Sequence, residues 1–184
     1  MATLLRIIII IIAILTSPIG SAQDTDSAFT DALRSYVALH RSSANGLAPP
    51  TDPAAIEHRT VVLAARIQAG RMNARPGDIL GPAASRIREA VRTEMAGPHG
   101  AAIRSSIDDD NVYGVRLRVN HRYPPGLPRV TMPAPILTKL PALPEQLEFR
   151  FLGRSLILID TQAGLVVDVL HDVLPVGRGG RASS

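Results

Sequence analysis

The sequence contains no cysteine and no tryptophan among its 184 residues, and only three tyrosines and three phenylalanines. Without cysteine the fold cannot be held by disulfides, so packing must supply its stability. Nucleophilic catalysis has no recognisable motif either, because the chain lacks a G-x-S-x-G elbow and a G-x-x-x-x-G-K-[ST] phosphate loop. Nucleic-acid binding is not expected, since stacking residues are few and the net charge of +4 is spread along the chain.

The N-terminus has the pattern of a secretory signal. Arg6 is its only charge, an apolar stretch runs from Ile7 to Leu15, and Gly20-Ser21-Ala22 supplies small residues for cleavage. The apolar core of about nine residues is far shorter than the roughly 20 that span a bilayer. We therefore predict a signal peptide over 1–22 and an exported chain, periplasmic or secreted, with no integral membrane segment after cleavage. The alternative is an uncleaved membrane anchor.

The mature chain is expected to form one domain. About 162 residues remain after cleavage, enough for a single core. We predict an α+β domain over 23–176, with N-terminal helices packed on a C-terminal antiparallel three-stranded β-meander and joined to it by a proline-rich strap. The helical part is assigned to 23–110, a strand plus the strap to 111–146, and the meander to 147–174. Residues 177–184 are expected to be a disordered tail.

Apolar residues in the first half recur with the period of a helix. Asp52 is a good N-cap with Pro53 at the first helical position, and His40 extends the apolar stripe of the preceding helix. We interpret His40 as a half-buried core or capping residue. The helices are predicted from about Asp26 to Arg41, from Asp52 to Gly70, from Asp78 or Pro82 to Gly97, and as a shorter turn from Ala101 to Ile107.

The middle of the chain combines a short alternating stretch with a run of prolines. Val115, Leu117 and Val119 alternate with arginines, which predicts a strand from Val112 to Val119. Seven prolines between Pro124 and Pro144 then exclude a helix or a central strand and favour an extended, polyproline-like strap. A flexible linker between two domains is the alternative. The apolar residues that could anchor the strap are Leu127, Met132, Ile136, Leu137, Leu140 and Leu143.

The C-terminal part predicts three strands joined by two tight turns. Leu147 to Leu152 alternates with period two, Gly153-Arg154 suits a two-residue hairpin turn, and strands follow from Ser155 to Asp160 and from Leu165 to Leu170. We expect Leu152 to pair with Ser155 and Asp160 with Leu165. In that register one face is apolar apart from Asp160 and offers a surface for the helices. Its apolar members are Leu147, Phe149, Phe151, Leu156, Leu158, Leu165, Val167 and Val169.

Two carboxylates of the meander raise the possibility of a catalytic pair. In the predicted register Asp160 and Asp168 point to opposite faces of the sheet, so they cannot share a substrate. Asp168 shares its face with Arg150, and a long or water-bridged ion pair between them is plausible.

Several sequence elements resemble a group of uncharacterised exported bacterial proteins. The elements are Val119-Asn120-His121-Arg122-Tyr123-Pro124, Leu140-Pro141-Ala142-Leu143-Pro144 and the run from Leu147 to Val169. The resemblance is strong over roughly the C-terminal third. In the helical part it holds only in outline. It implies no activity, so no functional residue is carried over. The abundance of Ala, Arg, Pro and Gly beside a single lysine, Lys139, is typical of a GC-rich bacterial genome.

Few residues are candidates for chemistry. His121, beside Tyr123, lies where the predicted strand enters the strap, and irregular backbone of that kind often lines pockets. Asp108, Asp109 and Asp110 could supply oxygen ligands to calcium, but they lack the spacing of an EF-hand loop. A solvated loop is the simpler interpretation of the three carboxylates, as is a structural role for His121.

Two hypotheses about function remain. The first is a non-catalytic cell-envelope module that binds an envelope protein or a small ligand through the strap and the polar sheet face. The second is a periplasmic hydrolase or metal-dependent enzyme that uses His121 and the Asp108–Asp110 cluster, with Tyr123. We favour the first. No cofactor is predicted, and the sequence does not indicate the oligomeric state.

Overall fold

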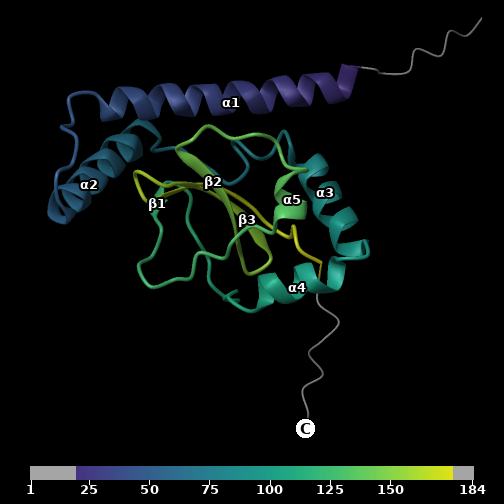
Figure 1. Ribbon diagram of the computed structural model, residues 1–184. Coiled ribbons are helices and arrows are strands. Elements are labelled where there is room, and N and C mark those ends of the chain that lie inside the picture. Colours follow the sequence, from purple (N-terminus) through teal and green to yellow (C-terminus); the bar gives the residue numbers. More distant parts are fainter. Residues whose placement is uncertain (1–19, 176–184) are drawn as a thin grey trace, which may run out of the picture.

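The computed structural model describes residues 20–175, so the predicted tail and all but the last three residues of the predicted signal peptide lie outside it. The fold is α+β, with helices first and an antiparallel sheet last (Figure 1). The elements are α1 (Gly20–Ala44), α2 (Pro53–Gly70), α3 (Ala84–Ala96), α4 (Gly100–Asp108), β1 (His121–Arg122), α5 (Ala134–Leu137), β2 (Leu147–Leu152), β3 (Ser155–Asp160) and β4 (Leu165–Leu170).

The sheet has four strands in the order β1-β4-β3-β2. Both predicted turns form, and Leu152 pairs with Ser155 and Asp160 with Leu165, as expected. The prediction of three strands is wrong, because the short strand β1 adds to the free edge of β4. Two residues are too few to give a recognisable period, so β1 carries no signal in the sequence.

A β-bulge corrects the predicted faces of β4. Leu158 lies opposite Asp168 while its neighbour Ile159 lies opposite Val166, so Val167 is an extra residue in the strand. From Asp168 onward, each side chain of β4 therefore points to the face opposite the predicted one. Val169 therefore packs on the second face of the sheet, contrary to the prediction, and Asp168 shares the side of Leu158.

The helices bury one face of the sheet. In Figure 1, α1 crosses one side of the molecule, α2 lies at one end, and α3 and α4 lie at the other. Apolar residues of the helices and the meander form one core with the buried residues of the strap. Asp52 caps α2 as predicted, its carboxylate accepting from the amide of Ala55 at 2.9 Å. Ile56, placed on the apolar stripe of α2 by its spacing, is 54% exposed because this end of the helix extends past the core.

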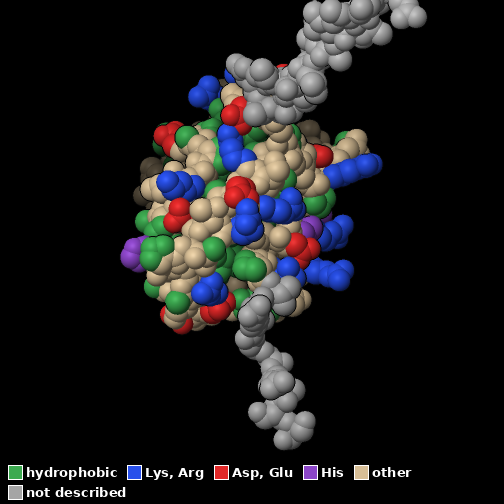
Figure 2. All heavy atoms as spheres, turned by 90° about the vertical axis from the view of Figure 1, so that its right-hand side faces the viewer, with side chains coloured by type: hydrophobic (Ala, Val, Ile, Leu, Met, Phe, Trp, Pro, Cys, Tyr) green, Lys and Arg blue, Asp and Glu red, His purple; other side chains and the backbone are tan. Residues whose placement is uncertain are grey.

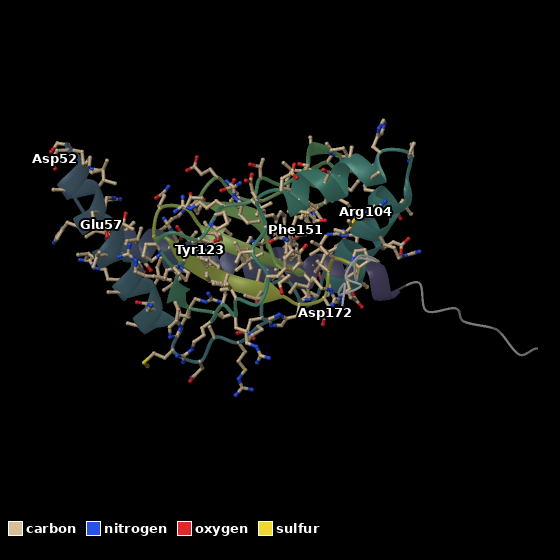
Figure 3. The ribbon with its side chains drawn as sticks, turned by 90° about the horizontal axis from the view of Figure 1, so that it is seen from below. Asp52, Glu57, Arg104, Tyr123, Phe151 and Asp172 are labelled. Carbon is tan, nitrogen blue, oxygen red and sulfur yellow. The ribbon has the colours of Figure 1, made fainter. Side chains whose placement is uncertain are left out.

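The second face of the sheet is covered by irregular chain. Val119 and Tyr123 are buried there against Ile157, Ile159 and neighbours from β4, and Tyr123 lies over the sheet in Figure 3. The predicted strand from 112 to 119 does not form, because the segment packs flat on this face without a strand beside it. We call 112–119 the cover segment.

The proline-rich strap is packed against the core but is not extended throughout. Ala134–Leu137 forms the short helix α5, which contradicts the prediction that excluded a helix. Pro135 is tolerated because it lies in the first turn, where no helical partner exists for its missing amide. Of the predicted anchors, Met132, Ile136 and Leu140 are buried, whereas Leu137 is 49% exposed.

Candidate functional site

A groove runs between α1 and the chain that leads into β2. One hollow of about 680 Å³ lies between α1 and residues 141–144. A second, of about 790 Å³, lies between the C-terminal end of α1 and residues 144–146. Arg41 and Pro144 line both hollows, so the two adjoin. Figure 1 shows the strand-entering loop beneath α1. We call the two hollows together the α1 groove.

The α1 groove has apolar walls and a basic rim. Leu33, Val37 and Leu143 contribute to its walls, beside the prolines of the strap. Three arginines line it, of which Arg34 pairs with Asp31 and Arg86 with Asp26, and one glutamate lies at the far end. Arg41 forms no ion pair within the described part of the chain, 20–175. The α1 groove thus suits an elongated ligand with an apolar body and an anionic group.

A buried polar network lies under the second hollow. Asp160, at the end of β3, is fully buried and accepts hydrogen bonds from the Tyr36 hydroxyl at 2.7 Å and from Nδ1 of His40 at 2.6 Å. Its other oxygen accepts from the amides of Gln162 and Ala163. Because a carboxylate only accepts, Nδ1 of His40 carries the hydrogen. The carboxylate therefore has a donor on each side and needs no further partner.

His40 is held at both ring nitrogens. Nε2 lies 3.3 Å from Oε1 of Gln162, which also lines the second hollow. The hydrogen bond to Asp160 raises the pKa of His40 above its usual 6.5, against the opposing effect of burial. A general base needs a free nitrogen that faces its substrate. With both nitrogens occupied, His40 is an anchor for α1 rather than a base.

Tyr36 joins this network to α2. Burial, with the nearby Asp160 carboxylate, raises the pKa of its hydroxyl, which therefore stays protonated and donates. The guanidinium of Arg71 lies 5.2 Å from the centre of the Tyr36 ring, a cation–π geometry, and donates to the carbonyl of Val167 at 3.0 Å. Arg71 thereby links the end of α2 to both α1 and β4.

Asp168 has its own set of donors. Its carboxylate accepts from the backbone amides of Gly77, Ile79 and Leu80 at 2.6 to 2.8 Å, and from the amide of Val169. The suggested ion pair with Arg150 is therefore wrong. Arg150 instead pairs with Glu148 and lies 3.4 Å from the carbonyl of Val130.

The bulge also corrects the relation between the two buried aspartates. Asp160 and Asp168 were predicted on opposite faces, but both lie on the helix-facing side, since their partners across the strands are Leu165 and Leu158 of the main core. They still form no catalytic pair, because each carboxylate is taken up by separate donors. Asp160 holds α1, and Asp168 holds the loop before α3.

The predicted site residues near β1 are not brought together. His121 is exposed, and its Nδ1 lies 3.0 Å from the carbonyl of Val119. The hydroxyl of Tyr123 donates to the carbonyl of Pro128 at 2.6 Å, and burial raises its pKa. Each side chain is thus occupied by the backbone of its own segment. In Figure 3, Tyr123 and Asp172 lie at different ends of the sheet.

The Asp108–Asp110 cluster lies at the end of α4. Tyr113 donates to Asp108 at 2.5 Å, and the other two side chains are exposed. Within residues 20–175, no three His, Asp or Glu side chains gather closely enough to hold a metal ion. The same part of the chain contains no helix that is both long and apolar enough to cross a membrane.

Comparison of the chain with protein-family models, with curated proteins and with solved structures gave no match. The resemblance to exported bacterial proteins therefore stays a prediction.

The sequence held one signal for the buried network that the predictions did not use. Tyr36 and His40 are one helical turn apart on an apolar stripe, and in the predicted register Asp160 is the one charged residue on an apolar sheet face. Two hydrogen-bond donors on one buried helix face and a single carboxylate on the facing sheet are expected to pair, since a buried charge needs hydrogen-bond partners.

Proposed function

We propose that this chain is an exported, non-catalytic binding module of the cell envelope. The observation that carries the proposal is the α1 groove, with apolar walls and a basic rim that includes the unpaired Arg41. The groove lies between two firmly anchored elements. The Tyr36 and His40 bonds to Asp160 fix α1, and Ile136 and Leu140 bury the strap that leads to the other wall.

The proposed ligand is elongated and amphipathic, with an apolar body against Val37 and Leu143 and an anionic group near Arg41. Burial of apolar surface supplies most of the binding free energy in such a groove, and the charge adds selectivity. A small envelope ligand and an extended segment of an envelope protein both meet this description. Either ligand would need to reach the α1 groove from the solvent.

Two variants on α1 test the proposal. Ala38 is exposed and lines the groove, so Ala38→Arg fills it while keeping a good helix former. Ala28 is equally exposed on α1 but lies outside the groove, and Ala28→Arg is the matched control. The C-terminally tagged full chain is crosslinked in cells and recovered from the envelope. A ligand that is stoichiometric with wild type and Ala28→Arg and is lost with Ala38→Arg supports the proposal.

Recovery that is equal for all three chains contradicts the groove as the binding site. Export has a separate readout. Mass spectrometry of the purified chain should find a mature N-terminus at Gln23, whereas an intact N-terminus in the cytoplasm contradicts the envelope location. The two results are independent, so a failed capture does not hide a failed export.

A further inference from the structure

The cover segment has an unsatisfied backbone. Within residues 20–175, none of the backbone N–H or C=O groups of 112–118 forms a hydrogen bond. Backbone groups that are not paired within a protein must be paired with water or with another chain. An extended segment of this kind has the same property as the open edge of a sheet, which is a template for an additional strand.

The two sides of the cover segment are well defined. Leu117 and Val119 pack on the sheet, and Val119 is buried. Arg116 and Arg118 alternate with them and are exposed. Residues 116–119 therefore keep the two-residue alternation of a strand, although no strand lies beside them, whereas the chain bends at Gly114.

Charge on this part of the chain is of one sign. The sequence contains no Asp or Glu between Asp110 and Glu145, and this stretch holds four arginines and Lys139. Neither Arg116 nor Arg118 forms an ion pair with any of the described residues. The cover segment thus presents two free cations at the spacing of one side of a strand.

The arginines of the α3 and α4 face allow a comparison. Figure 2 shows the face that carries α3 and α4, where acidic side chains stand among the basic ones. On that face Arg92 pairs with Glu89, whereas Arg88 and Arg104 donate to backbone carbonyls. Arg116 and Arg118 differ from these three, because neither a carboxylate nor a carbonyl of the described residues accepts a hydrogen bond from them.

A cleft of about 430 Å³ lies beside the cover segment. Val115 and Leu117 form one wall, and Leu152, Ile157 and Val169 from the strands contribute apolar surface to the rest. Ser155, His171 and Asp172 add polar groups to the lining, and Asp172 is paired with Arg154. Val115 is 37% exposed at its mouth. Side chains of an added strand that point toward the sheet would enter this cleft beside its apolar residues, and those that point outward would lie near Arg116 and Arg118.

We propose that the cover segment is a docking strand for an extended acidic segment of a partner protein. The partner adds as a strand through backbone hydrogen bonds, in the mode of β-augmentation. Its apolar side chains enter the cleft, and its carboxylates lie across from Arg116 and Arg118, where opposite charges stabilise a strand pair. A second copy of this chain is the poorer occupant, because it would place arginine against arginine. This site is distinct from the α1 groove and does not rest on it.

The test uses a blocked, fluorescein-labelled hexapeptide of alternating Glu and Val, titrated with the full chain and followed by anisotropy. Hydrogen–deuterium exchange with saturating peptide should protect amides within 112–118. The double variant Arg116→Glu/Arg118→Glu should raise the Kd at least about tenfold, since it reverses two cross-strand charge pairs. The control Arg92→Glu/Lys139→Glu changes the net charge equally at exposed positions outside both proposed sites and should raise the Kd less than about threefold.

Several outcomes overturn the proposal. They are the absence of binding, an equal effect of both double variants, equal binding of a Lys–Val hexapeptide, and binding without protection of 112–118. Protection that depends on protein concentration without peptide would assign the segment to a second copy instead. Because the exchange measurement uses wild-type protein, the result does not depend on the folding of any variant.

Discussion

Nδ1 of His40 lies 2.6 Å from Oδ2 of Asp160, although the two residues are 120 positions apart in the chain. Tyr36, one turn earlier on α1, donates to the same oxygen. The pair fixes both the position of α1 along the sheet and its rotation about its own axis. One carboxylate thus orients the helix that forms a wall of the α1 groove.

Replacement of that carboxylate should be strongly destabilising. Asp160→Asn places an amide against two side-chain donors and removes the buried carboxylate to which Nδ1 of His40 donates. Breaking a buried pair of this kind costs about 3 kcal/mol or more. Urea unfolding followed by circular dichroism measures the change. Asp31→Asn is the control, because its pair with Arg34 is exposed and worth less than about 1 kcal/mol. Equal stability of the two variants would contradict the anchoring role.

The His40 pair should make stability depend on pH. The pKa of His40 is raised in the folded state, so between the unfolded value near 6.5 and the folded value the folded chain binds more protons. Its contribution is complete below the unfolded pKa and is lost as pH rises through the folded pKa. The free energy of unfolding of wild type should therefore fall in that interval relative to His40→Gln, which does not titrate. Parallel curves for the two proteins from pH 5.5 to 9 would refute the assignment.

The loop before α3 should depend on Asp168. In Asp168→Asn an NH₂ group meets backbone amides, and charge-assisted hydrogen bonds worth about 1.5–3 kcal/mol each are weakened. Amide exchange at Ile79 and Leu80 should accelerate more than exchange in β3, because the loop opens locally before the protein unfolds. Uniform acceleration throughout the chain would show that Asp168 supports only global stability.

Gly81 should not tolerate a side chain. A Cβ atom at this position would lie 2.3 Å from the carbonyl oxygen of Gly77, in the loop that holds Asp168. Gly81→Ala should therefore cost about 1–3 kcal/mol by forcing the backbone apart. At Gly97, a Cβ atom would come no nearer than 3.4 Å, so Gly97→Ala is the control and should change the melting temperature little. A larger loss for the control would show that the loop is not closely packed.

The meander was predictable because its signals are local. Alternation with period two sets the faces of β2 and β3, and glycines with positive φ, Gly153 and Gly164, set the two turns. The sheet face on which Val169 packs was not predictable, because the position of a bulge depends on tertiary packing and leaves no local pattern in the sequence. Here it brings Asp168 to the amides of the loop before α3.

The prediction for the middle of the chain was wrong because the structure there depends on contacts that are not local. Residues 112–119 have the pattern of a strand, but a strand also needs a neighbour, and the sheet edge beside β4 is taken by β1. The candidate residues His121 and Tyr123 were chosen for their place at an irregular junction. Their bonds to local carbonyls could not be read from the sequence, because they depend on how the backbone bends.

The position of the two buried aspartates in the chain has a kinetic consequence. Asp160 and Asp168 secure α1 and the loop before α3, yet both are in the last 25 residues of the sequence. β1 likewise pairs with β4, the final strand. Contacts between such distant positions form late, since closing long loops is slow. The N-terminal half therefore cannot lock into place while it leaves the ribosome. The helices of that half therefore stay without these two anchors until β3 and β4 have been made.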